Sequence, residues 1–461
     1  MTTMPTQTDT NTLNSYNPST GEIVGSVPIT PVAQIDSIIA KAHAALPAWQ
    51  ALSAQERADI LKPAGKILEE RAEELGKLLS LEQGKPISEG IGEVKGCAAR
   101  MDWESQEVAD AVQPEILKSN GIESTVYYDG YGVCATITPW NFPMLMAHWT
   151  IVPALVAGNT VVCKPSEQTP LIADEYVKIL NQFLPEGVLQ IIHGEDDQGK
   201  ALVAGDVNMI AFTGSKNAGQ HIMASAAKGL KRLVLELGSK DPLVVLEGAD
   251  LDKAAQYGVR NALRNCGQVC VSTERIYVQD SIKDQFIDKL KEQVAEFKVA
   301  DCHDESARIG PMVMREQKEH VLGQIKDAID KGANVVMGNE PMDGNFIAPT
   351  LLDNCNHDMD IMVVETFGPV VCVQSVGDAD EAVKLANDTE YGLGAVVFGE
   401  EQLARKVGRQ LTAGMIGVNK AIGGATGTPW VGARHSGFSY HSGPMGHRQF
   451  CQVRVISTND E

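Results

Sequence analysis

The run Val133-Cys-Ala-Thr-Ile137 is short and rich in β-branched residues, and it stops at Thr138-Pro-Trp-Asn-Phe-Pro143, where two prolines oppose any continued regular element. Stretches with a helical pattern follow at 169–183 and 217–228. Similar apolar runs alternate with these stretches, at 160–163, 188–192, 209–212 and 233–235. Strands that alternate with helices predict βαβ units and a parallel, doubly wound sheet.

The same rhythm returns after Gly238. Apolar runs lie at 243–246, 276–278, 370–373 and 395–398, with helical patterns at 254–264 and 282–297. We therefore predict an α/β fold with two doubly wound α/β domains, preceded by a helical segment at 31–80. Two further segments, 113–128 and 448–456, have extended or alternating patterns that fit neither sheet. We expect them to be edge strands that pair with another domain or subunit.

The composition narrows the class of protein. The chain has 461 residues, 43% of them hydrophobic, and a formal net charge of -21, which disfavours binding to nucleic acid or to an anionic membrane. The polar segment 1–11 predicts no signal peptide, and we find no run apolar enough to span a bilayer, so we expect a cytoplasmic protein. Nine cysteines without a Cys-x-x-Cys pair indicate free thiols and no metal site.

Three polar residues stand where they could carry chemistry. Cys270 ends the stretch Asn265-Cys-Gly-Gln-Val-Cys270, although a single cysteine is more often a small buried hydrophobe. Glu236 ends an apolar run, where loss of solvent raises a carboxyl pKa toward that of a general base; the alternative is a salt bridge with Lys240. Asn141 lies between two prolines and is either a preorganised oxyanion donor or an ordinary turn residue.

Two loops have features of a nucleotide site. Phe212-Thr-Gly-Ser215 follows a predicted strand and opens a helix, so its backbone N–H groups could face a pyrophosphate. Lys164-Pro-Ser-Glu167 offers an ammonium and a carboxylate to a ribose, or is only a solvated loop. The fingerprint G-x-G-x-x-G is absent, which argues against an ordinary dinucleotide site.

Taken in order, these pieces resemble the aldehyde dehydrogenase superfamily, in particular its succinate-semialdehyde dehydrogenase-like branch. The resemblance runs from about Tyr16 to the C-terminal tail. The matching motifs are Asn17-Pro-Ser-Thr-Gly21, Thr138-Pro-Trp-Asn-Phe-Pro143, Lys164-Pro-Ser-Glu-Gln-Thr-Pro170, Phe212-Thr-Gly-Ser215 with Gly219, Glu236-Leu-Gly-Ser-Lys240, Gly267-Gln-Val-Cys270, Glu365-Thr-Phe-Gly-Pro-Val370 and Tyr391-Gly-Leu393.

The resemblance implies a covalent mechanism. Cys270 would attack the aldehyde carbonyl, and the Asn141 amide with the backbone N–H of Cys270 would hold the oxyanion. After hydride transfer to a nicotinamide, a water activated by Glu236 would hydrolyse the thioester. The sequence departs from the family at Ser239, at 428–434 and at His441, which replaces an acidic residue near the water path of many relatives. A histidine could relay a proton there, and a structural role is the alternative that we favour.

The resemblance also implies a cofactor site. Lys164 and Glu167 would bind the adenosine ribose, Ser215 the pyrophosphate, and Glu365 with Phe367 the nicotinamide ribose. The whole predicted set is Thr138, Pro139, Trp140, Lys164, Ser166, Glu167, Gly194, Phe212, Thr213, Gly214, Ser215, Glu365 and Phe367. A carboxylate at 167 accepts a hydrogen bond from a ribose hydroxyl and repels a 2′-phosphate, so we expect NAD, with NADP possible through Lys164.

The substrate residues implied by the resemblance are mostly apolar. Phe142, Met146, Trp149 and Trp430 would line the tunnel, which favours a medium aliphatic or aromatic aldehyde. Succinate semialdehyde is the alternative. Arg264 matches one of two arginines that such relatives use, but Trp149 replaces the other, and we interpret Arg264 as a helix-end residue.

The predicted domains follow the same resemblance. Residues 1–112 and 129–237 would form the NAD-binding domain, 238–430 the catalytic domain, and 113–128 with 431–461 an oligomerisation element, so we expect a homodimer or homotetramer. A non-redox thiol acyltransferase or esterase, a CoA-acylating enzyme and a non-catalytic scaffold are alternatives that the nucleotide loops and the intact polar residues disfavour. A switch disulfide between Cys266 and Cys270 is less favoured than simple packing of Cys266.

Overall fold

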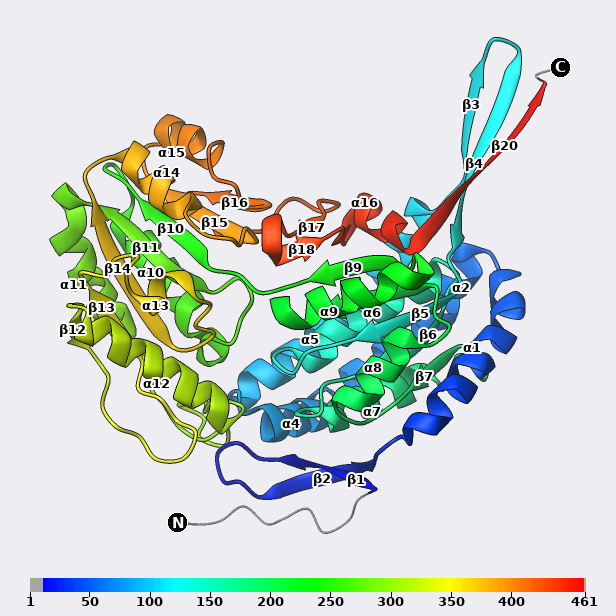
Figure 1. Cartoon of the computed structure of the whole chain (residues 1–461), viewed down its shortest axis with the longest axis horizontal. Coiled ribbons are helices and arrows are strands. Elements are labelled where there is room, and N and C mark those ends of the chain that lie inside the picture. The colour runs from blue at the N-terminus through cyan, green and yellow to red at the C-terminus, as the bar shows by residue number, and fades with distance from the viewer. Residues whose placement is uncertain (1–10, 460–461) are drawn as a thin grey trace.

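The computed structural model describes residues 11–459. Residues 1–10, on which the expectation of no signal peptide largely rests, lie outside them. The chain forms two lobes, each built around its own sheet, and a three-stranded arm that projects from one of them (Figure 1). Among the described residues, no helix is long and apolar enough to cross a membrane.

The first lobe contains a six-stranded sheet with the order β18-β9-β8-β5-β6-β7. Five strands are parallel, and β18 joins β9 antiparallel at the edge. The strands are β5 (Val133–Ile137), β6 (Thr160–Lys164), β7 (Leu189–Ile191), β8 (Met209–Thr213), β9 (Arg232–Glu236) and β18 (Gly437–Phe438). The five predicted strands are therefore confirmed to within about one residue at either end.

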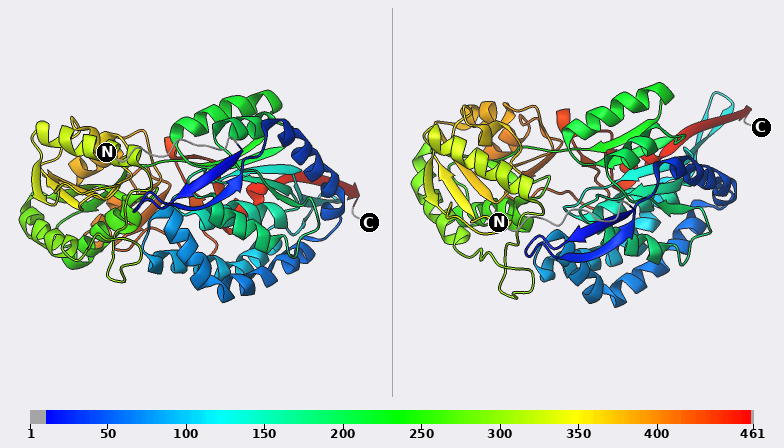
Figure 2. Two further views of the ribbon diagram at one scale, coloured as in Figure 1. Left: turned by 90° about the horizontal axis from the view of Figure 1, so that it is seen from below. Right: turned by 60° about the horizontal axis from the view of Figure 1, so that its bottom comes forward.

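Both faces of this sheet are buried, which explains why its strands read as continuous apolar runs. Cys134 packs into the core on one face, whereas Val133 and Ala135 pack into the core on the other. Helices cover the two faces (Figure 2). They are α1 (Ile35–Gln50), α2 (Ala54–Leu61), α3 (Pro63–Glu70), α4 (Ala72–Gln83), α5 (Ile87–Ala111), α6 (Pro143–Val156), α7 (Pro170–Leu180), α8 (Asp196–Ala204) and α9 (Lys216–Ala226).

The second lobe contains a seven-stranded sheet with the order β12-β13-β14-β11-β10-β15-β16, in which only the edge strand β12 is antiparallel. Its strands are β10 (Asp241–Val245), β11 (Thr273–Gln279), β12 (Asn334–Met337), β13 (Thr350–Asp353), β14 (Val370–Val376), β15 (Gly394–Phe398) and β16 (Met415–Val418). Its helices are α10 (Leu251–Leu263), α11 (Lys283–Val294), α12 (Arg315–Asp330), α13 (Asp360–Val363), α14 (Ala379–Asn387) and α15 (Glu401–Gly408). The two doubly wound sheets confirm the predicted fold class.

The arm is a sheet of three antiparallel strands, β3 (Glu115–Ser119), β4 (Ile122–Gly130) and β20 (Cys451–Asn459). The two segments expected to be edge strands thus pair with each other over the full length of β20 (Figure 1). Exposed apolar side chains line the arm: Ile116, Leu117, Ile122, Val453, Val455 and Ile456.

Short elements complete the chain. A hairpin of β1 (Thr12–Tyr16) and β2 (Ile23–Pro28) precedes α1, and β17 (Trp430–Val431) pairs with β19 (Tyr440–His441) before α16 (Gly443–His447). The chain passes between the two sheets over the few residues from the end of β9 to the start of β10. The predicted domain boundaries near this link and near residue 430 stay predictions.

Candidate active site

Cys270 follows an unusual turn that joins α10 to β11. Three consecutive residues, Asn265, Cys266 and Gly267, have positive φ angles of 50°, 58° and 72°. A side chain at 267 would overlap the carbonyl oxygen of Gly368, so only glycine fits this position. The turn presents the partly exposed Cys270 thiol at a cavity of about 570 Å³ between the lobes.

Asn141 lines the same cavity and is held by the same turn. Its side-chain amide donates a hydrogen bond to the carbonyl of Gln268 (3.1 Å), and its own carbonyl accepts one from the Asn265 amide (2.9 Å). The buried Lys85 ammonium also donates to the Asn141 carbonyl (2.8 Å). The structure therefore brings the predicted oxyanion donor and the predicted nucleophile together and fixes the backbone of both.

The Cys270 thiol has a strongly perturbed pKa. Burial is the main cause and raises the pKa to about 12; the carboxylates of Glu236, Asp241 and Glu365 add to the rise, and Arg264 opposes it. Ser239, which the sequence marks only as a departure from the family, donates its hydroxyl to the Cys270 carbonyl. The free thiol is protonated at neutral pH, so attack requires loss of that proton.

Glu236 is 5% exposed at the end of β9. Neither of its carboxylate oxygens has a hydrogen-bond partner within residues 11–459. Burial raises its pKa well above the ordinary value, and the nearby Trp430 side chain offsets only part of that rise. The alternative salt bridge with Lys240 is wrong, because the Lys240 ammonium pairs instead with Glu274 at 2.6 Å.

Seven predicted cofactor residues line this cavity together with Cys270 and Asn141. They are Pro139, Trp140, Thr213, Gly214, Ser215, Glu365 and Phe367. Ser215 is the N-cap of α9, and its side chain accepts a hydrogen bond from the Ala218 N–H (3.3 Å), so the positive end of a helix faces the space. Phe212 occupies the place that a side chain at Gly214 would need. A helix N-terminus, a small residue and a carboxylate suit the pyrophosphate and ribose of a dinucleotide.

The remaining predicted cofactor residues lie outside the cavity lining. Thr138 and Phe212 are buried behind it, and Gly194 follows β7 with a φ of 145°. Ser166 is buried in the loop after β6. In the same loop, the Lys164 ammonium lies 3.9 Å from the carboxylate of the more exposed Glu167. Burial lowers the pKa of Lys164, and Glu167 partly counteracts this.

A buried network that the sequence did not reveal holds the loop of Glu365 and Phe367. The Glu274 carboxylate, paired with Lys240, accepts hydrogen bonds from the backbone N–H groups of Thr366 (2.9 Å) and Phe367 (2.9 Å). The Glu365 carboxylate accepts one from the Ser239 N–H (2.8 Å), and burial with Glu274 nearby raises its pKa to about 8. Phe367 has a φ of 50° and meets Trp140 edge to face at 5.5 Å.

The predicted substrate residues divide among three cavities. Phe142 and Met146 line the cavity of Cys270. The rings of Trp149 and Trp430 lie tilted against each other (5.5 Å, 46°), and both residues line a second cavity of about 350 Å³. Arg264, with Phe142, lines a third of about 600 Å³.

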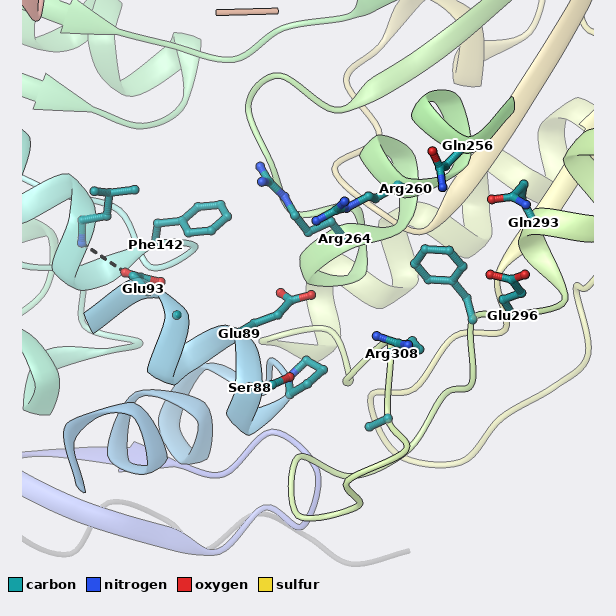
Figure 3. Close-up of a pocket in the computed structure, with 15 residues that line it drawn as sticks. Ser88, Glu89, Glu93, Phe142, Gln256, Arg260, Arg264, Gln293, Glu296 and Arg308 are labelled. Atoms are coloured by element: carbon teal, nitrogen blue, oxygen red, sulfur yellow. Dashed lines mark hydrogen bonds between the residues drawn. The ribbon is translucent and has the colours of Figure 1, made fainter. Parts of the chain in front are cut away.

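This third cavity contains a group of arginines. Figure 3 shows Arg260, Arg264 and Arg308 around one space, with Glu89 and Glu296 among the other residues that line it. The Arg264 side chain packs over the Phe142 ring (5.5 Å), and its buried Nε has no hydrogen-bond partner in the described chain. Arg264 does follow the end of α10, but it also faces a cavity that adjoins the site through Phe142.

The other cysteines are buried. The Cys266 sulfur contacts the Met312 sulfur (3.4 Å), a packing arrangement. One group of potential metal ligands occurs in residues 11–459, formed by the adjacent Asp301, Cys302 and His303, away from the motifs discussed above. The segment contains no Cys-x-x-Cys pair, so the sequence gives no signal for it.

Comparison with known proteins agrees with this geometry. The model of the aldehyde dehydrogenase family matches residues 5–456. The chain is 35% identical over 466 residues to a chloroplastic betaine aldehyde dehydrogenase of Beta vulgaris, covering 97% of this chain and 93% of that protein. It is also 35% identical over 449 residues to the succinate-semialdehyde dehydrogenase of Escherichia coli that is named for NADP(+), covering 95% and 93%.

A solved relative has the same fold. The betaine aldehyde dehydrogenase of Staphylococcus aureus, determined in complex with NAD+, superimposes with a TM-score of 0.92 at 30% identity and covers 98% of this chain and 92% of that one. With nearly the whole chain matched by the family model and by relatives above 30% identity, the chain belongs to the aldehyde dehydrogenase family and is an NAD(P)-dependent oxidoreductase.

Proposed function

We propose that this enzyme oxidises an aldehyde to the carboxylic acid with NAD, using Cys270 as nucleophile, Asn141 as oxyanion donor and Glu236 as general base. One observation carries the proposal: Cys270 and Asn141 share a cavity with the residues suited to a dinucleotide, and the nearby buried Glu236 carboxylate accepts no hydrogen bond from the described residues. A non-redox thiol acyltransferase would have no use for the nucleotide-binding part of that cavity.

The proposed steps follow from this placement. The Cys270 thiol releases its proton to solvent in the cavity, its sulfur bonds to the aldehyde carbon, and the Asn141 amide with the Cys270 N–H stabilises the oxyanion. When bound, the dinucleotide supplies the nicotinamide ring that accepts the hydride. Water then attacks the resulting thioester, Glu236 accepts its proton, and the C–S bond breaks to return the sulfur to Cys270.

We expect Cys270→Ala to abolish aldehyde-dependent NADH formation. Glu236→Gln should retain a rapid first burst of NADH but lower the steady rate by roughly 10²–10⁴-fold, because only hydrolysis needs the base. The steady rate of the unmutated enzyme should rise with pH, since the raised pKa of Glu236 leaves less of it as carboxylate at low pH. Stopped-flow absorbance at several pH values measures all three. Equal loss of burst and steady rate in Glu236→Gln would contradict the assignment.

NAD is the proposed cofactor because of the charge at the end of β6. The Glu167 carboxylate, 39% exposed and next to Lys164, is the acidic group that we propose to meet the adenosine ribose. A carboxylate there favours a free 2′-hydroxyl and opposes a 2′-phosphate by like-charge repulsion.

Replacing Glu167 by Ser should shift the preference toward NADP. We expect the ratio of kcat/KM for NAD to that for NADP to fall by about tenfold or more, because repulsion is removed while Lys164 stays. Glu186→Ser, which removes an exposed carboxylate paired with Lys41, is the control for the general effect of lost negative charge. An unchanged ratio in Glu167→Ser would show that this residue does not distinguish a ribose 2′-hydroxyl from a 2′-phosphate.

For the substrate, we propose a medium aliphatic or aromatic aldehyde. Phe142 and Met146 give the reacting cavity an apolar wall beside Cys270. A specific observation also favours the alternative, a semialdehyde such as succinate semialdehyde: Arg260, Arg264 and Arg308 surround the adjoining cavity and form no ion pair within the described chain. A carboxylate at the far end of the substrate would suit them.

A substrate panel separates the two candidates. With hexanal, benzaldehyde and succinate semialdehyde at saturating NAD, an apolar preference predicts that Arg264→Gln leaves all three kcat/KM values nearly unchanged. If Arg264 binds a carboxylate, the variant should lose about tenfold or more with succinate semialdehyde alone. Arg315→Gln, at an exposed helical ion pair, serves as control. Preference for succinate semialdehyde in the unmutated enzyme would overturn the apolar proposal.

We also propose a cytoplasmic homodimer or homotetramer that assembles through the arm. All nine cysteines are free thiols, as a reducing compartment requires. The exposed apolar residues of β20 and β3 would be covered by a partner strand or face. Replacing Val453 and Val455 by Glu should shift the mass in analytical ultracentrifugation toward the monomer, and an unchanged mass would exclude the arm as the interface.

A further inference from the structure

We propose that His441 accepts the proton that Glu236 removes from the hydrolytic water, and passes it to the cavity lined by Trp149 and Trp430. This inference rests on the proposed role of Glu236. It gives His441 a proton-transfer function through Glu236, in place of the structural role favoured by the sequence.

The two side chains are neighbours in a closed environment. His441 Nε2 lies 3.9 Å from Glu236 Oε1, and the two residues are 6% and 5% exposed. Because the Glu236 oxygens have no other partner, a small rotation of the carboxylate toward the ring would form a hydrogen bond without breaking one. Catalytic hydrogen bonds are often long before substrate binds.

The fold explains this proximity. β18 pairs antiparallel with β9, with Gly437 opposite Glu236. The chain then turns back through β19, where His441 pairs opposite Trp430 of β17. The C-terminal segment therefore adds a strand to the first sheet beside Glu236 and returns the imidazole to it.

The second ring nitrogen of His441 contacts Ser442 and not Glu236. His441 Nδ1 lies 2.9 Å from the Ser442 hydroxyl, and Ser442 lines the cavity of about 350 Å³. Glu104 and Glu107 line the same cavity and offer proton acceptors. One imidazole thus connects the buried base on one side with a polar cavity on the other.

Aromatic contacts orient the His441 ring, and burial keeps it neutral. Trp430 stacks on the imidazole (6.2 Å, 24°), and Trp149 lies tilted against it (5.1 Å). Burial lowers the pKa of His441 to about 4; Glu104 raises it and His447 lowers it further. Glu236 is the third ionisable group beside the ring. The imidazole stays neutral at pH 7, so it can accept a proton on one nitrogen while it releases one from the other.

Hydrolysis of the thioester moves both protons of the attacking water. Water oxygen bonds to the thioester carbon, and one water proton moves to Glu236, then to His441 Nε2, while the Nδ1 proton leaves through Ser442. The C–S bond breaks with its electron pair going to sulfur. The second water proton moves from the new acid to the sulfur, which leaves the product as carboxylate. One proton is released overall, and no additional oxidant or reductant is needed.

The test uses His441→Ala in the full-length enzyme, with aldehyde and NAD. We expect a normal NADH burst, a steady rate lowered by about 10²-fold, and partial recovery of the steady rate when imidazole is added. His357→Gln is the matched control, since this half-buried histidine of the second lobe pairs with Asp388 at 2.9 Å and takes no part in the proposed relay. In this control variant, the burst and the steady rate should stay near normal, and added imidazole should not change them.

Two outcomes would overturn the proposal: an unchanged steady rate in His441→Ala, or a lowered rate that imidazole does not restore. Loss of the burst would likewise refute it, because the damage would then precede hydrolysis. If His441→Ala does not fold, His441→Gln retains most of the volume, and its steady rate should still be lowered with the burst intact; a normal steady rate there would refute the relay. Absence of aldehyde-dependent NADH formation in the unmutated enzyme would instead refute the proposed function itself.

Discussion

The active site depends on a reciprocal pair of hydrogen bonds between the two lobes. The Asn141 amide donates to the Gln268 carbonyl, and the Asn265 amide donates to the Asn141 carbonyl. These two hydrogen bonds join the proline-bounded turn of the first lobe to the left-handed turn of the second lobe. The second turn is possible only because Gly267 has no side chain to meet Gly368. The backbone turn before the nucleophile and the side chain of the oxyanion donor are thus fixed against each other.

Burial sets the chemistry of the same site. Because Glu236 has neither a hydrogen bond nor an ion pair with Lys or Arg in the described residues, its charge is costly and its pKa rises; Cys270 is raised for the same reason. Lys240, four residues after Glu236, pairs with Glu274 and donates a hydrogen bond to the Thr366 hydroxyl in the loop of Phe367. The chain thereby keeps the Glu236 carboxylate free of lysine and arginine partners within the described residues, while a buried ion pair fixes the loop proposed to hold the cofactor.

Local patterns were enough to predict the strands of the first sheet and the presence of a second one, because buried parallel strands are continuous apolar runs. They also identified Cys270, Asn141 and the loop of Ser215, which are marked by glycine, proline and strand ends. They failed where the partner is remote in sequence: Lys240 with Glu274, Asn141 with Asn265, and His441 with Glu236. Local patterns also do not predict that Trp149 and Arg264 line different cavities, because a residue's neighbours in the sequence do not determine which cavity its side chain faces.

The central claim is that Cys270 becomes acylated and that Glu236 acts afterwards. Its most direct test is the mass of Glu236→Gln mixed with hexanal and NAD, quenched in acid, and mapped by peptide mass spectrometry. We expect a mass increase equal to the hexanoyl group, located on the peptide that contains Cys270. NADH formation without that adduct, or an adduct on another residue, would contradict it.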